Sequence, residues 1–114
     1  MIEEMFKLPI KPLSLNSAYR GRRFATVELL SYKQAIGLLA PKLPQIQSST
    51  ARLEVHYRFG MSSKASDVDN CVKCLQDALA DKYGFNDREI YKMVVEKVDC
   101  KKGEEFIEFN IKKL

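Results

Sequence analysis

The sequence predicts one small domain of the α/β (α+β) class over residues 1–114, a four-stranded mixed sheet with two helices in the order β-α-β-α-β-β. Residues 52–59 alternate between apolar and polar side chains, which predicts a half-buried strand. From Asn70 onward the apolar residues instead recur at i, i+3, i+4 and i+7, the spacing of one helical face. A chain of 114 residues can bury a core of its own without disulfides.

The first half of the chain is predicted to contain a strand, a long loop and a helix. Residues 5–10 alternate loosely, and Pro9 places this strand at an edge or at a strand end. Residues 11–27 show no sustained periodicity and contain Pro, Ser, Asn, Gly and Arg, so we predict a loop, which at this length is often functional. Thr26 can cap the helix that follows, and Pro41 ends it.

The second half is predicted to carry the second helix and two more strands. The helix runs from residue 70 to residue 81 or 82, and Gly84 can adopt the left-handed conformation that ends a helix. Strands are predicted at residues 90–98 and 105–111, joined by a hairpin connection at residues 99–104. The pattern leaves the order of the strands within the sheet open.

The composition indicates a cytoplasmic protein that has no contact with membranes. Apolar residues make up 46% of the chain and charged residues 30%, as in ordinary globular proteins. No apolar run approaches the roughly 18 to 20 residues of a membrane span. The start, Met1-Ile2-Glu3-Glu4, lacks the basic and then apolar layout of a signal peptide.

Three cysteines, an odd number, fit a reducing compartment better than a disulfide framework. Cys71 and Cys74 form a CxxC pair on the apolar face of the predicted helix, so we predict that they pack in the core. A zinc site would need two further ligands, and Cys100 and His56 are the candidates that remain. His56 lies alone on the polar face of its strand and is interpreted as a surface or structural residue.

The net charge of +4 is distributed unevenly along the chain. Residues 1–66 hold ten Lys and Arg against four acids, whereas residues 67–114 hold nine against eleven. A basic half joined to a half that begins with an acidic cluster suits a surface that binds a polyanion around a metal site. A mildly basic, solvated surface would show the same totals.

Two carboxylates, Asp67 and Asp69, stand where an extended segment gives way to the second helix. Alternate side chains of an extended segment point the same way, which places both carboxylates beside one solvent-facing spot. Asp is also a common helix cap, so one of the two needs no function. Like charges this close repel each other unless a cation lies between them. With Lys73 about one turn further on, the pair indicates a metal-binding or catalytic site.

Asp87 follows the end of the same helix. Because that helix spans roughly 15 Å, Asp87 approaches Asp67 and Asp69 only if the chain returns along a strand that pairs beside them. Three carboxylates at one spot would suit Mg²⁺, which prefers oxygen ligands and positions water for phosphodiester hydrolysis. Lys73 would add a fixed positive charge near the scissile phosphate. The simpler alternative for Lys73 is an i, i+4 ion pair with Asp69 or Asp77.

The run Asp67-Val68-Asp69-Asn70, with Lys73 next and then Gly84-Phe85-Asn86-Asp87 after an apolar helix, resembles the RusA family of Holliday-junction endodeoxyribonucleases of bacteria and their phages. The early segment agrees with this resemblance. Pro12, Ser14, Asn16 and Tyr19, then basic residues and a helix containing Tyr32, resemble the N-terminal loop and first helix of that family. The resemblance spans residues 6–112.

The resemblance implies a Mg²⁺-dependent nuclease, with Mn²⁺ as a substitute, that nicks two strands of a four-way DNA junction during recombination and repair. Asp67, Asp69 and Asp87 would be the metal-binding catalytic acids, and Lys73 the catalytic lysine. The residues expected at the DNA are Asn16, Arg20, Arg22, Arg23 and Lys64. A homodimer would match the two-fold symmetry of such a junction. Neither a nucleotide cofactor nor a membrane partner is implied.

The chain departs from the family pattern in two places. The segment before the first Asp, often strongly basic in the family, is here Ser62-Ser63-Lys64-Ala65-Ser66. Where some relatives have two adjacent acids, this chain has Asn86-Asp87, and Glu89 is a further acid nearby. Two other interpretations remain: a DNA-binding recombination or replication accessory of the same fold without catalysis, and a protein-interaction domain whose acids are caps and turn formers.

Overall fold

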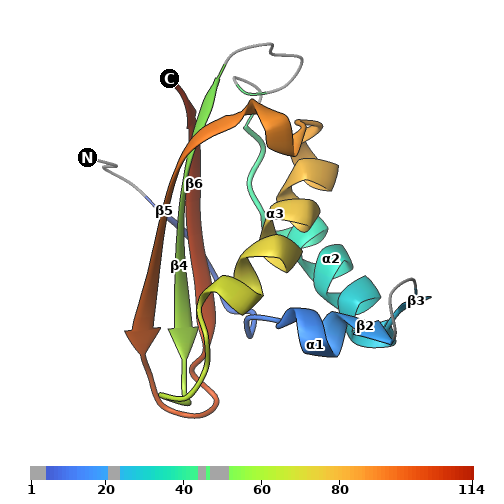
Figure 1. The fold of residues 1–114 in the computed structure, drawn as a ribbon, viewed down its shortest axis with the longest axis vertical. Coiled ribbons are helices and arrows are strands. Elements are labelled where there is room, and N and C mark those ends of the chain that lie inside the picture. Colours follow the sequence, from blue (N-terminus) through green and yellow to red (C-terminus); the bar gives the residue numbers. More distant parts are fainter. Residues whose placement is uncertain (1–4, 21–23, 44–45, 47–51) are drawn as a thin grey trace.

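A computed structural model describes residues 5–20, 24–43, 46 and 52–114 of the chain. It confirms the predicted class, a single small domain with two main helices and a four-stranded mixed sheet (Figure 1). The elements are β1 (Phe6–Leu8), α1 (Leu15–Ala18), β2 (Tyr19–Arg20), β3 (Phe24–Ala25), α2 (Val27–Leu39), β4 (Leu53–Met61), α3 (Asp69–Tyr83), the 3-10 turn η2 (Asp87–Glu89), β5 (Ile90–Asp99) and β6 (Phe106–Lys113).

The strands of the main sheet lie in the order β1-β6-β4-β5. β4 pairs with β5 in parallel and with β6 antiparallel, and β6 pairs antiparallel with β1. The predicted hairpin between the last two strands is therefore wrong, because β4 lies between them. α3 carries the chain back to the start of β4, so β5 pairs in parallel beside it, and residues 100–105 then lead past the end of β4 to its other side.

The core lies between the helices and the one face of the sheet that they cover (Figure 1). Val55, Tyr57 and Phe59 of β4 are buried, as the alternating pattern predicted. Cys71 and Cys74 are buried as well, at 4% and 1% exposure, which confirms them as core residues with free thiols. No helix of the described residues is long and apolar enough to cross a membrane.

The segment predicted as one long loop contains short elements. The Ser14 hydroxyl accepts a hydrogen bond from the Ser17 N–H and opens the single helical turn α1, and β2 and β3 form a two-stranded ribbon. A four-residue turn and two-residue strands are too short to produce a periodic pattern. Arg22 and Arg23 lie outside the described residues.

The ends of the main helices match their predicted signals. The Thr26 hydroxyl accepts a hydrogen bond from the Leu29 N–H at 3.3 Å and caps α2. Gly84 ends α3 with a φ of 75°, the left-handed conformation that glycine adopts without strain. α3 therefore stops where the sequence indicated, and the chain turns toward β5.

His56 is a structural residue on the open face of the sheet. Its Nε2 atom lies 2.5 Å from Oε2 of Glu54, a carboxylate whose side chain is only 8% exposed. Lys92 and Lys112 approach the same carboxylate at 4.0 and 3.9 Å. The hydrogen bond from His56, followed by the two lysines, lowers the pKa of Glu54 below its ordinary value.

Candidate active site

Three charged side chains follow one another along one face of α3. Asp69, Lys73 and Asp77 are spaced by four residues, which places them in a row one helical turn apart. The Nζ atom of Lys73 lies 2.9 Å from Oδ1 of Asp77 and 2.9 Å from Oδ2 of Asp87. The ammonium group thus joins the helix to the segment that precedes β5.

Asp87 is free to contact Lys73 because Asn86 and Glu89, and not Asp87, cap the turn in which it lies. The Asn86 side chain accepts a hydrogen bond from the Arg88 N–H, and the Glu89 carboxylate accepts one from the Asn86 N–H at 2.7 Å. Glu89, the competing acid in the sequence, is engaged in this capping box. The carboxylate of Asp87 is left to face Lys73, with 42% of its side chain exposed.

Lys73 is a fixed cation at this surface. Hydrogen bonds to Asp87 and then to Asp77 raise its pKa above the usual lysine value. It remains an ammonium at neutral pH and cannot act as a base there. Because half of its side chain is exposed, the ammonium can still meet an anion from solution. The predicted i, i+4 pair with Asp77 is present together with the contact to Asp87.

Asp67 and Asp69 are exposed at the start of α3. The N-cap of this helix is Val68, which makes no side-chain cap hydrogen bond, so neither acid serves as the cap. Neither carboxylate forms a hydrogen bond or ion pair with another residue in the described part of the chain. Both are available to a ligand.

The structure brings Asp87 back along α3 as far as Lys73, which lies one helical turn from Asp69. Among the described residues, no three His, Cys, Asp or Glu side chains are grouped closely enough to hold a metal ion. β5 begins beside Leu53 at the start of β4, whereas Asp67 follows the end of β4. The fifteen residues of α3 span about 22 Å between these two ends. Asp87 nevertheless contacts Lys73, the fifth residue of α3, so the segment after the helix folds back along it toward Asp69. The shared metal-binding role of the three acids stays a prediction.

The donor chemistry nevertheless fits Mg²⁺. Asp67, Asp69 and Asp87 offer carboxylate oxygens at the surface, and Mg²⁺ is commonly held by one or two carboxylates together with waters and substrate phosphates. A preformed cage of three protein ligands is not required for such binding.

The loop that leads to Asp67 is held by a lysine from the edge strand. Lys97 of β5 donates from Nζ to the backbone carbonyls of Lys64, at 2.9 Å, and Ser66, at 2.7 Å. Lys64 is itself an exposed residue of this loop. Sequence reasoning missed Lys97 because its contact depends on long-range strand pairing. In the sequence, Asp77 was considered only as an ion-pair partner of Lys73. The four-residue spacing of the two residues was the signal that could have placed Asp77 at the site.

The remaining residues expected at the DNA lie in the N-terminal segment. The backbone of Asn16 belongs to α1 and that of Arg20 to β2. Lys64 precedes Asp67 by three residues in the sequence. The DNA-binding roles of Lys64, Asn16 and Arg20 stay predictions.

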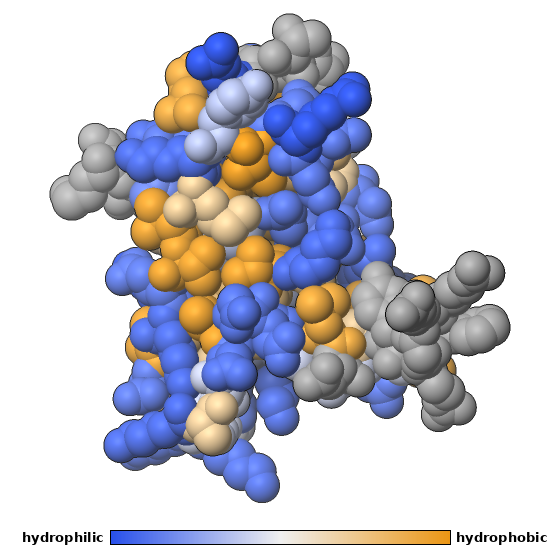
Figure 2. Space-filling view, viewed as in Figure 1, coloured by the Kyte–Doolittle hydropathy of each residue, from blue (hydrophilic) through white to orange (hydrophobic). Residues whose placement is uncertain are grey.

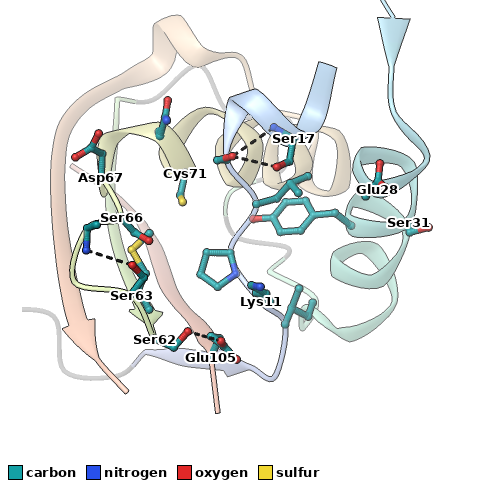
Figure 3. Close-up of a pocket in the computed structure, with 18 of the residues that line it drawn as sticks. Lys11, Ser17, Glu28, Ser31, Ser62, Ser63, Ser66, Asp67, Cys71 and Glu105 are labelled. Atoms are coloured by element: carbon teal, nitrogen blue, oxygen red, sulfur yellow. Dashed lines mark hydrogen bonds between the residues drawn. The ribbon is translucent and has the colours of Figure 1, made fainter. Parts of the chain in front are cut away.

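A cavity of about 900 Å³ adjoins the start of α3 (Figure 3). Its walls come from residues 10–14 and 17, from α2, from residues 61–63 and 65–67, from the first turn of α3 and from Glu105. Ser62 donates to Oε2 of Glu105 at 2.7 Å and closes one side. Asp67 lies at the rim, and the Cys71 thiol points inward.

Exposed carboxylates and a fixed lysine along and beside α3 are suited to an enzyme that acts on phosphodiesters. The comparison with protein families makes this specific: the family described as Endodeoxyribonuclease RusA matches residues 11–110. The chain belongs to the RusA endodeoxyribonuclease family, which implies nuclease activity on Holliday junctions. A comparison with curated proteins finds no match.

Proposed function

We propose that this protein is a Mg²⁺-dependent, structure-selective endodeoxyribonuclease that resolves four-way DNA junctions by paired nicks during recombination and repair in the cytoplasm. The observation that carries the proposal is Lys73, held at 2.9 Å from both Asp77 and Asp87 on an exposed surface. A permanent cation fixed beside unpaired carboxylates is suited to the charge that develops on a phosphodiester under attack.

In this proposal Lys73 binds the scissile phosphate. Its ammonium is placed by Asp87 and Asp77 before DNA arrives, so no reorganisation is needed during the reaction. Asp67, Asp69 and Asp87 are the catalytic and metal-binding carboxylates. When bound, Mg²⁺, or Mn²⁺ in its place, supplies positive charge at the phosphate and activates the attacking water.

The DNA surface in this proposal extends from the N-terminal segment to the loop before α3. Lys64 contacts phosphate beside the active site, and Asn16, Arg20, Arg22 and Arg23 contact the backbone of an arm. The basic balance of residues 1–66 supports this placement.

A homodimer places two such sites about a two-fold axis, which matches the symmetry of a four-way junction. β5 supports self-association because it is an edge strand, and its Met93 side chain is 41% exposed. Figure 2 shows apolar side chains gathered on the side of the molecule where β5 lies in Figure 1. Sedimentation of the free protein measures the assembly, and a monomer at all concentrations would contradict it.

The test is a nicking assay on a synthetic four-way junction, with and without Mg²⁺, beside a linear duplex of the same sequence. We expect symmetric cleavage of the junction that requires the metal. Tight junction binding without cleavage across several sequences, with Mn²⁺ as well, would instead indicate the non-catalytic accessory. If the protein does not bind DNA at all, both DNA-binding interpretations are excluded and the protein-interaction domain is the interpretation that remains.

Replacing Asp69 by Asn separates catalysis from capping. The variant should lose nicking by about 100-fold or more, while its junction binding is kept or improved because one negative charge near phosphate is removed. Its thermal midpoint should stay close to that of the parent, since Asp69 is exposed and makes no cap hydrogen bond. A large loss of stability would support a structural role in its place.

A further inference from the structure

The cavity beside Asp67 is lined by both apolar and polar side chains. Apolar side chains such as Leu13 and Met61 form part of its walls, and six serines add hydroxyl groups. Asn70 and Lys11 are further polar residues of the lining. A volume of about 900 Å³ is that of a pocket for an organic ligand and exceeds what a single ion or water needs.

Tyr32 contributes a buried hydroxyl to this wall. The residue lines the cavity and is only 6% exposed, yet its hydroxyl has no hydrogen-bond partner among the described residues. A buried hydroxyl without a partner costs free energy, so such groups usually meet a ligand or an ordered water. Burial raises the pKa of Tyr32 well above its ordinary value, which keeps the hydroxyl a donor at neutral pH.

The charges around the cavity exclude a phosphate as its occupant. Among the described residues that line it, the carboxylates of Glu28, Asp67 and Glu105 outnumber the single cation, Lys11. An anion placed there would be repelled. A flat heterocycle with apolar faces and N–H and carbonyl groups at its edge instead matches apolar walls, acceptor carboxylates and a donor hydroxyl.

We propose that this cavity receives one unstacked nucleobase from the branch point of the DNA, with the Tyr32 hydroxyl donating to its edge. The inference rests on the proposed nuclease function and deepens it, because it names the feature that distinguishes branched from linear DNA. Bases of a linear duplex are stacked and paired, and removing one costs a few kcal/mol. Bases at a branch point have lost part of that stacking, so they enter at lower cost.

Two tyrosines provide a matched test. Tyr32→Phe removes the unpartnered hydroxyl. Tyr83→Phe removes a hydroxyl that donates to the Pro41 carbonyl, and neither Tyr83 nor Pro41 lines the cavity. Dissociation constants for a four-way junction and for a linear duplex are measured in EDTA, where cleavage is absent. Tyr32→Phe should reduce the preference for the junction by about threefold to tenfold, the effect of one hydrogen bond.

The stability of the same variants separates a ligand role from a structural one. Tyr32→Phe should melt at or above the temperature of the parent, because the hydroxyl has no partner to lose. Tyr83→Phe should melt lower and keep the full preference for the junction. If Tyr32→Phe melts lower as Tyr83→Phe does, the hydroxyl has a structural partner and the inference is overturned.

A second variant fills the cavity. The Cys71 thiol points into it (Figure 3), so Cys71→Met extends an apolar side chain into the space that the base would occupy. With 2-aminopurine at the branch point, binding of the parent should change the fluorescence of this base analogue, and Cys71→Met should reduce that change.

The outcomes distinguish this inference from the proposed function. Nicking and junction preference that persist unchanged in both Tyr32→Phe and Cys71→Met overturn the cavity as a base site and leave the nuclease intact. A parent protein that neither nicks junctions nor prefers them over linear DNA overturns both. Reduced preference in the two cavity variants, with Tyr83→Phe unaffected, supports the inference.

Discussion

At the scale of single residues, the ion pair between Lys73 and Asp77 joins two successive turns of α3. A second aspartate of α3, four residues after Asp77, also forms an ion pair with a lysine. Asp81 of α3 pairs with Lys33 of α2 at 3.3 Å, and its side chain is 70% exposed. Asp77 and Asp81 thus each pair with a lysine at the surface, Asp77 within α3 and Asp81 across to α2. Only the lysine of Asp77 also touches Asp87.

Replacing Asp77 by Asn should therefore reduce nicking, with Asp81→Asn as its control. We expect a loss of about tenfold in kcat, because Lys73 keeps Asp87 but is held less firmly beside the phosphate. Both variants should lose no more than about 1 kcal/mol of stability, as for other exposed ion pairs. Equal nicking activity of the two variants would show that Asp77 has no role in positioning Lys73 for catalysis.

The residues of the candidate site can be singled out in the sequence, but their arrangement cannot, and their roles stay predictions. Asp67, Asp69, Lys73 and Asp87 stand out in the sequence by type and spacing. Their mutual placement depends on where β5 pairs, and nothing in the local pattern specifies that β5 begins beside Leu53. The structure brings Asp87 to Lys73, one turn from Asp69, and the metal-binding role of the three carboxylates stays a prediction.

At the scale of elements, the helix ends were predictable because their signals are local. Thr26 caps α2 and Gly84 ends α3 through contacts within four residues. Strand neighbours depend on partners far along the chain, and the last connection was accordingly mistaken for a hairpin. Its turn is real, with Gly103 at a φ of 92°, but it joins strands on either side of β4.

Two glycines should respond to alanine with opposite signs. A Cβ at Gly60 of β4 would lie 2.3 Å from ring atoms of Phe106, so Gly60→Ala should destabilise the fold by about 1 to 3 kcal/mol. At Gly37 of α2 nothing lies within 4 Å of an added Cβ, and alanine should stabilise by about 0.5 to 1 kcal/mol. Denaturant titration measures both. If Gly60→Ala were neutral, the Phe106 ring would move aside freely.

At the scale of the whole molecule, the sheet has a covered face and an open face, and each contains groups whose titration affects folding. On the open face, Glu54 has a lowered pKa, so its contribution to stability is present above the ordinary value of 4.5 and is lost as the pH falls through the lower folded value. In the covered core, burial raises the pKa of Cys71 to about 11 and that of Tyr83 to about 12.

The core groups predict a loss of stability in alkali. An unfolded thiol ionises near 9.0, whereas the Cys71 thiol in the fold keeps its proton to about 11. Between these values the unfolded state is favoured by deprotonation, and Cys71 alone should lower the free energy of unfolding by about 2 to 3 kcal/mol. Denaturant midpoints at pH 8, 9, 10 and 11 measure this slope, and Cys71→Val should flatten it because valine fills a similar volume without an ionisable group. A parent protein equally stable at pH 8 and pH 11 would show that its thiols and phenols reach solvent, contrary to the packing of the core between sheet and helices.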